Sequence, residues 1–174
     1  MSERLLYFAY GSNLHPERMR RRVPSARPLG CAVLTGHVLR FHKHSLVDGS
    51  GKCDAHYTGR AEDRVYGAVY SLVVSEKAAL DAVEGPGYEV AERVVTHEGA
   101  PLNVFLYRAR PDAVDPGIAP YDWYHDLVLA GARHHGLPGP YVARLARVSV
   151  RADPDAGRAA RERAVLAAEA RAGA

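Results

Sequence analysis

The apolar segment Leu5–Tyr10 ends abruptly at the tripeptide Gly11-Ser12-Asn13, and this junction constrains the fold more than any other stretch of the sequence. An unbroken apolar and aromatic run of this length is typical of a buried strand. Gly, Ser and Asn favour tight turns with local side-chain to backbone hydrogen bonds. Pro16 suits the first turn of a basic helix over residues 15–22. The chain is therefore expected to begin with a buried strand, a turn and a helix.

Short strands and a few helices are expected along the rest of the chain. Strands are expected at residues 29–44, with a turn near Gly36, and at residues 52–59 and 64–74, where Gly67 indicates close approach of another backbone. Ser75 is expected to cap a helix over residues 76–83, which Gly85 and Pro86 end. A hairpin of residues 88–97 and 102–109, helices at 121–135 and 141–148, and a last helix capped by Asp153-Pro154 complete the order. This order predicts an α+β protein with mainly antiparallel strands.

Composition and charge exclude several classes of protein. The 174 residues suffice for one core, and 47% hydrophobic with 25% charged residues argue against a disordered chain. We expect a domain over residues 1–150 and an Ala- and Arg-rich helical tail over residues 151–174. A formal net charge of +3 is too small and too evenly spread to indicate a nucleic-acid partner. No apolar run fits a signal peptide or a membrane span, so we expect a cytoplasmic protein without a membrane partner.

Two local features could carry chemistry. The turn Gly11–Asn13 joins a strand to a helix and so exposes backbone amides in a small concavity that suits a carboxylate. The alternative is an ordinary strand-to-helix turn that binds nothing. Glu84 ends a well-formed helix, where a carboxylate opposes the helix macrodipole, and apolar surroundings would favour proton uptake and make it a useful base near neutrality. A carboxylate that simply points into water is the alternative.

The remaining polar residues suggest less. The chain has ten tyrosines against three phenylalanines, and some of them could line a polar cavity because a buried hydroxyl needs a partner. His42 and His44 are expected to share a strand face, and His56 could lie nearby. No metal-binding motif is present, however, and we expect no metal and no cofactor. Cys31 and Cys53 lack CxxC spacing and are expected to be small, buried, inert thiols.

Taken together, these motifs resemble the gamma-glutamylcyclotransferase-like family. The resemblance begins at residues 6–14, LYFAYGSNL, and continues through Pro24-Ser25-Ala26 and Val65–Tyr70. It includes Leu80–Gly85 with Tyr88 shortly after, and closes with Tyr124, Gly131-Ala132 and Gly136-Leu137-Pro138. It covers about residues 5–148 in consistent order and leaves the tail outside.

The resemblance implies a small, mainly antiparallel β-barrel flanked by helices. It implies release of 5-oxoproline and a free amine from a small γ-glutamyl amide, without a metal or cofactor. Glu84 matches the family's catalytic glutamate. The residues that the resemblance implies for substrate binding are Tyr10, Gly11, Ser12, Asn13, Leu14, Tyr88, Tyr107 and Tyr124.

Several alternatives stay open at this point. The leaving amine could be an amino acid, glutathione, a polyamine, a lysine side chain or a natural-product intermediate. The last would make the protein a deprotecting cyclotransferase, which suits the GC-rich bacterial style of the sequence. Residues 110–120 and the strand with His37, His42 and His44 are the expected specificity elements. A silent binding protein for γ-glutamyl ligands is a further alternative, and the sequence leaves both a monomer and a homodimer open.

Overall fold

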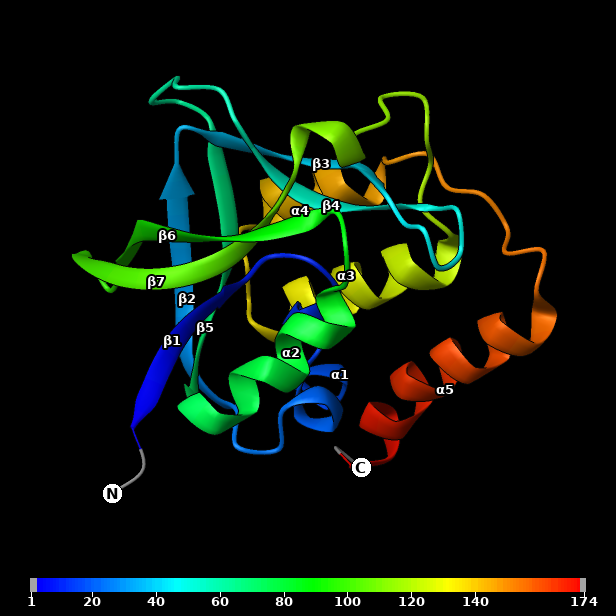
Figure 1. Ribbon diagram of the computed structural model, residues 1–174, viewed down its shortest axis with the longest axis horizontal. Helices are drawn as coiled ribbons and strands as arrows, with labels where there is room; N and C mark the ends of the chain where they lie inside the picture. The colour runs from blue at the N-terminus through cyan, green and yellow to red at the C-terminus, as the bar shows by residue number, and fades with distance from the viewer. Residues whose placement is uncertain (1–2, 173–174) are drawn as a thin grey trace.

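Five strands close into a barrel in the computed structural model, which describes residues 3–172, with side chains for residues 3–167. The strands are β1 (Arg4–Ala9), β2 (Arg27–Thr35), β5 (Arg64–Val73), β6 (Tyr88–His97) and β7 (Ala100–Ala109). Their order is β1-β5-β2-β6-β7. Neighbouring strands are antiparallel except β1 and β7, which pair in parallel where Tyr7 faces Phe105. The predicted α+β class with a mainly antiparallel barrel is confirmed (Figure 1).

Strands β3 (His37–His44) and β4 (Gly51–Tyr57) form a separate antiparallel pair. The predicted turn near Gly36 separates β2 from β3, and Gly36 has a positive φ of 76°. The strands on either side of it then diverge, because β2 joins the barrel and β3 pairs with β4. The register of this pair shifts between Arg40 and Lys43, as a β-bulge does.

The helices lie outside the strands (Figure 1). They are α1 (Pro16–Arg22), α2 (Lys77–Glu84), α3 (Asp122–His134), α4 (Gly139–Ala146) and α5 (Ala156–Ala172), with 3-10 turns at Ser12–Leu14, Val74–Glu76 and Pro111–Ala113. The tail helix α5 packs on α1 and α3. Residues 173–174 of the predicted tail lie outside the described residues.

Two of the predicted helix caps are wrong. Ser75 lies inside the 3-10 turn Val74–Glu76, so α2 begins at Lys77 without a side-chain cap. Asp155 caps α5 in place of Asp153, since its Oδ1 accepts a 2.8 Å hydrogen bond from the Arg158 amide. Asp153 instead accepts bonds from Arg158 and from the Trp123 ring.

The core runs from the barrel interior to the inner faces of the helices. Phe8 of β1, Val69 of β5 and Leu127 of α3 are all fully buried. The close approach expected at Gly67 is present, because a Cβ there would lie 2.3 Å from the Ala9 carbonyl oxygen and 2.7 Å from the Phe8 ring. Strand β1 therefore fits tightly against β5, and this packing fixes the position of the turn that follows β1.

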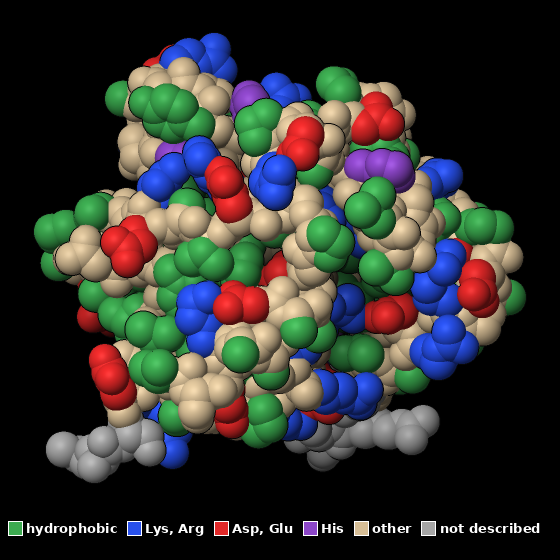
Figure 2. Space-filling model, viewed as in Figure 1, with side chains coloured by type: hydrophobic (Ala, Val, Ile, Leu, Met, Phe, Trp, Pro, Cys, Tyr) green, Lys and Arg blue, Asp and Glu red, His purple; other side chains and the backbone are tan. Residues whose placement is uncertain are grey.

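The surface carries charges of both signs. Figure 2 shows Lys and Arg side chains interspersed with Asp and Glu over the visible face, including that of α5. On this face the two signs alternate and neither forms an extended patch. Among the described residues, none of the helices combines the length and apolar character needed to cross a membrane.

Candidate active site

The turn after β1 forms one wall of the candidate site. Ser12–Leu14 form a single 3-10 turn directly after Gly11. Because the first amides of a helical turn have no acceptor inside it, those of Ser12 and Asn13 are oriented to bind an acceptor from outside. A Cβ on Gly11 would lie 3.0 Å from the Cys53 Cβ and 3.3 Å from the Tyr124 hydroxyl. Glycine thus allows the backbone to approach the opposite wall.

Asn13 connects this turn to the Glu84 carboxylate. Its side-chain amide donates to Glu84 Oε1 at 2.7 Å and to the Tyr7 hydroxyl at 3.0 Å. The Asn13 Oδ1 accepts a 2.7 Å hydrogen bond from Arg22. The Arg22 guanidinium also lies 3.6 Å from Glu84 Oε1. These contacts hold the carboxylate in one position, which a base that acts on a bound substrate requires.

Glu84 is the last residue of α2 and its side chain is only 14% exposed. Gly85 follows with a φ of 70° and ends the helix. The helix end matches the sequence expectation, but the apolar surroundings that would favour proton uptake are not present at the carboxylate. An amide, a guanidinium and tyrosine hydroxyls surround the carboxylate instead.

Tyrosine hydroxyls line most of the remaining cavity wall. The Tyr124 hydroxyl accepts a 3.0 Å bond from the Cys53 amide, and the Tyr88 hydroxyl donates a 2.5 Å bond to the Cys53 carbonyl. The Tyr10 hydroxyl donates to the Tyr107 carbonyl, and the Tyr107 hydroxyl donates a 2.5 Å bond to Asp81. Burial raises the pKa of all four, so their hydroxyls stay protonated at neutral pH.

The cavity brings together most of the predicted site residues. It is lined by Tyr7, Tyr10, Gly11, Ser12, Asn13, Cys53, Glu84, Tyr88, Tyr107 and Tyr124. Leu14 is the exception and corrects the sequence expectation. Its side chain is 0% exposed and lies in the core, because the 3-10 turn directs it inward toward α3 at Gly131.

Two lining residues, Tyr7 and Cys53, are not among the substrate-binding residues that the resemblance implied. Tyr7 belongs to the buried β1 segment, and its pattern there does not distinguish a cavity wall from the core. Cys53 lies on β4, whose placement against Tyr124 depends on the tertiary fold. Burial raises the pKa of the Cys53 thiol to about 12, so it is protonated at neutral pH. The expectation of a buried, inert thiol is consistent with this environment, but the same expectation of burial is wrong for Cys31, which is exposed.

A larger outer cavity of about 290 Å³ adjoins this inner one. Ser12, Glu84, Tyr88 and Tyr124 line both, whereas the inner cavity alone has a volume of only about 30 Å³. A water-sized space is too small for a substrate, so a ligand at Glu84 must extend into the outer cavity. Apolar side chains at its mouth include Leu46, Val47 and Val83, which are all exposed.

Most charged groups of the outer cavity are already paired. Lys52 donates to Asp48 at 2.7 Å, and Arg158 pairs with Asp153. Arg18 is 12% exposed; its Nε donates to the Ser12 hydroxyl at 3.1 Å and its Nη1 contacts Glu162 of α5. The tail helix is therefore connected through Arg18 to the turn that lines the inner cavity.

Lys43 differs from these cations. Its side chain lies on β3, is 4% exposed, and places its ammonium 4.6 Å from the centre of the Tyr88 ring. No carboxylate of the described residues forms an ion pair with it. Burial lowers the pKa of Lys43, and the nearby Glu84 opposes that effect. The ammonium lines the outer cavity and is positioned to meet an anionic group of a ligand.

Of the two expected specificity elements, only the histidine-bearing strand contributes a residue to the cavities at Glu84. In the strand with His37, His42 and His44, it is Lys43 that lines the outer cavity, while His37 lines another cavity and His42 contacts Asp54. Residues 110–120 line neither of the two cavities at Glu84. The loop instead supports β3, since the Asp115 amide donates a 2.8 Å hydrogen bond to the His42 carbonyl.

The fold and this cavity define a class of protein: a small closed barrel with one carboxylate held in a tyrosine-rich cavity where the first strand ends. Comparison of this chain with known proteins identifies its relatives. Gamma-glutamylcyclotransferases of Mus musculus and Homo sapiens are each 32% identical over 154 residues, which is 82% of this chain and 78% of theirs. Residues 64–145 match the AIG2-like family. The chain belongs to the gamma-glutamylcyclotransferase family.

Solved structures agree with this assignment. One described as gamma-glutamyl cyclotransferase has a TM-score of 0.78 and 29% identity, covering 86% of this chain and 90% of its own. A Homo sapiens protein described as uncharacterized has a TM-score of 0.77 and 30% identity, with the same coverage. A yeast enzyme described as specific to glutathione is 12% identical with a TM-score of 0.58, which shows a shared fold alone.

Proposed function

We propose that this protein is a gamma-glutamylcyclotransferase that releases 5-oxoproline and a free amine from a small γ-glutamyl amide. The observation that carries the proposal is the position of Glu84. Among the residues that line the inner cavity it is the one carboxylate, and raised pKa values keep the tyrosine hydroxyls and the Cys53 thiol protonated. Proton transfer at neutral pH therefore falls to Glu84.

In the proposed reaction the substrate's own α-amine is the nucleophile. The amine arrives protonated, and the Glu84 carboxylate removes a proton so that the nitrogen can attack the γ-carbonyl carbon. The new C–N bond closes a five-membered ring, and the bond to the leaving nitrogen then breaks. In total the ring nitrogen loses two protons and the leaving amine gains two, and Glu84 is suited to carry them between the nitrogens.

The turn after β1 is proposed to hold the substrate for this attack. The amides of Ser12 and Asn13 are suited to bind the α-carboxylate or the oxyanion that forms at the γ-carbon. Nucleophile and electrophile belong to the same molecule, so holding a folded conformer is the main task of the cavity walls. The leaving amine would then extend into the outer cavity, past Lys43 and the apolar side chains at its mouth.

Release of 5-oxoproline from a panel of γ-glutamyl amides would test the proposal. Glu84→Gln keeps the shape of the side chain and a carbonyl acceptor for Asn13, but removes the base. The matched control is Glu92→Gln, because Glu92 is an exposed carboxylate on β6. We expect the wild type and the control to release 5-oxoproline and Glu84→Gln to lose at least roughly 10²-fold in kcat.

Two outcomes would contradict the proposal. Full activity in Glu84→Gln would exclude Glu84 as the base. A folded wild type that releases nothing from amides of amino acids, glutathione, polyamines and lysine would exclude the activity on these substrates. If γ-glutamyl ligands then raised its Tm, the alternative of a binding protein would be favoured.

A further inference from the structure

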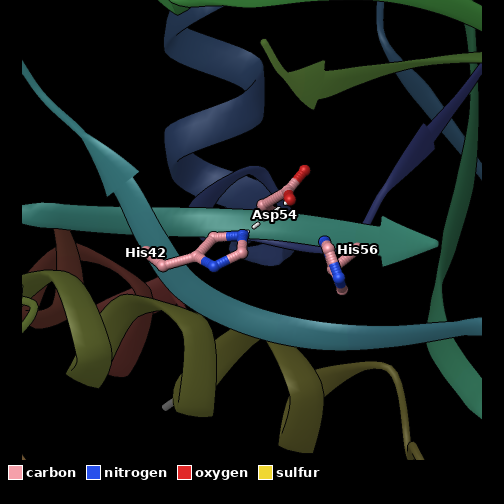
Figure 3. A group of neighbouring side chains, drawn as sticks. All are labelled: His42, Asp54 and His56. Carbon is pink, nitrogen blue, oxygen red and sulfur yellow. Dashed lines mark hydrogen bonds and ion pairs between the residues drawn. The ribbon is translucent and has the colours of Figure 1, made fainter. Parts of the chain in front are cut away.

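The pairing of β3 with β4 brings two histidines and a carboxylate together away from the cavities at Glu84. Asp54 and His56 are two residues apart on β4 and so share one face of the strand. His42 lies two residues after Arg40, the direct partner of Asp54 in the register, and its Nε2 reaches Asp54 Oδ2 across the strand pair. Figure 3 shows His42 reaching from β3 toward Asp54, with His56 further along β4.

The three side chains are spaced so that a small movement would bring their ligand atoms to the distances of a metal site. One ligand atom from each of His42, Asp54 and His56 lies within 4.8 Å of the others. His42 Nε2 is already 2.8 Å from Asp54 Oδ2. Bonds of about 2.0–2.2 Å to a tetrahedral zinc ion would place the ligand atoms a little over 3 Å apart. His56 is exposed, so its ring can make the remaining movement.

The surroundings of Asp54 provide the support that metal ligands usually have. Asp54 is 4% exposed, and its Oδ1 accepts a 2.8 Å hydrogen bond from the Ala109 amide of β7. This bond orients the carboxylate and leaves Oδ2 directed at His42. Hydrogen bonds of this kind fix a ligand's orientation and typically contribute 10–100-fold to metal affinity.

We propose that His42, Asp54 and His56 form a binding site for a zinc-like divalent cation. Two imidazoles and one carboxylate suit Zn²⁺ and disfavour the hard, oxygen-seeking Mg²⁺. The cation would take the place of the direct hydrogen bond between His42 and Asp54. Three protein ligands leave the fourth position of a tetrahedral ion to water. This site differs from the sequence expectation of no metal, because the three side chains meet only through the pairing of β3 with β4.

The site has a structural relation to the inner cavity without being part of it. Cys53 precedes Asp54 on β4, and its backbone holds the Tyr124 and Tyr88 hydroxyls at the cavity wall. A cation that joins β3 to β4 at Asp54 would therefore fix the strand that carries this wall. The proposal concerns metal binding and does not depend on the cyclotransferase activity.

Titration of metal-free protein with ZnCl2 would test the site directly. The protein should be free of any histidine tag, treated with EDTA and dialysed, then followed by calorimetry and by its Tm. We expect one zinc ion per chain, and a Tm rise of roughly 5–10 °C at hundredfold excess over Kd. MgCl2 at the same concentrations is expected to produce neither signal.

Two variants of the cluster and one control variant of another histidine test where the ion binds. His56→Gln changes an exposed side chain, and Asp54→Asn keeps an acceptor for the Ala109 amide while removing the charge. We expect each to weaken zinc binding at least tenfold. His44→Gln, on the same strand as His42 but outside the cluster, should bind as the wild type does. The proposal is overturned if the wild type shows no zinc-dependent heat or Tm shift. Wild-type affinity in His56→Gln, an equal loss in His44→Gln, or equal binding of Mg²⁺ would overturn it as well.

Discussion

The Asn13 side-chain amide donates a 2.7 Å hydrogen bond to Glu84 Oε1 and so joins the turn after β1 to the end of α2. The two residues are 71 positions apart in the sequence. The same amide also donates to Tyr7, and its oxygen accepts from Arg22. Asn13 is thus a positioning residue for the proposed base, and its other bonds fix the position of the amide itself.

Asn13→Ala should therefore impair catalysis without removing the base. We expect kcat for 5-oxoproline release to fall by roughly 10²-fold, because a displaced carboxylate no longer meets the substrate amine. Loss of the buried partner for Tyr7 and Arg22 should also lower the free energy of unfolding by about 1–3 kcal/mol. Kinetics and urea unfolding would measure both changes. Asn103→Ala, at an exposed position of β7, is the control. Wild-type kcat in Asn13→Ala would show that Glu84 holds its position without this bond.

Cys53→Ala distinguishes the proposed mechanism, in which Glu84 is the base, from one in which a Cys53 thiolate attacks the substrate. The Cys53 thiol lines the inner cavity but stays protonated, since burial raises its pKa to about 12. We expect the variant to keep its kcat and to lose about 1 kcal/mol of stability through the small void it leaves. Mass spectrometry during turnover should find no covalent adduct on the wild type. Loss of activity in a folded Cys53→Ala protein would favour a thiol mechanism over Glu84.

Lys43→Met tests which leaving amines the outer cavity favours. The buried Lys43 ammonium has no carboxylate partner among the described residues, so we expect it to pair with a carboxylate on the leaving amine. KM for γ-glutamyl-alanine should rise by roughly 10–100-fold, the equivalent of one hydrogen bond to a charged group. KM for γ-glutamyl ethylamide should change little. Lys77→Met is the control, because Lys77 also lies over aromatic rings but outside the outer cavity. An equal rise in KM for both substrates would contradict this role.

The stabilising contribution of the Asp48 carboxylate should be lost in acid. Burial acts to raise the pKa of Asp48, but the bonds from Lys52 and Ser50 outweigh it, so that pKa lies below its ordinary value of 3.8. A carboxylate with a lowered pKa stabilises the folded state above the ordinary value, and this contribution is lost as pH falls through the lowered value.

Asp48→Asn should accordingly lower the free energy of unfolding by about 3 kcal/mol near neutral pH, because it leaves Lys52 buried without its partner. The difference from the wild type should shrink as pH falls below 3.8. Urea unfolding across this range measures the effect, with the exposed Asp112→Asn as control. A difference that stays constant with pH would show that the carboxylate charge contributes nothing.

Hydrophobic runs and turn residues are local signals, and they predicted the α+β class and mainly antiparallel strands, whereas the barrel was implied by the resemblance to the family. The ends of elements pointed to the turn residues and to Glu84, whereas the resemblance implied Tyr88, Tyr107 and Tyr124 as further binding residues. The bulge in β3 and the position of Cys53 depend on which strands pair, and pairing is not encoded by any one segment. Leu14 shows the same limit at short range, because a single 3-10 turn decided whether its side chain lay in the cavity or the core.

Arg18 connects the Ser12 hydroxyl to Glu162, so the tail helix shares a wall of the outer cavity with the barrel domain. The tail lies outside the stretch that resembles the family, and it packs on α1 and α3, not on the strands. Mutations in α5 can therefore remodel the outer cavity while the barrel and Glu84 stay unchanged. Exchange of residues 151–172 between homologues offers protein engineers a route to altered leaving-group preference that keeps the reaction itself intact.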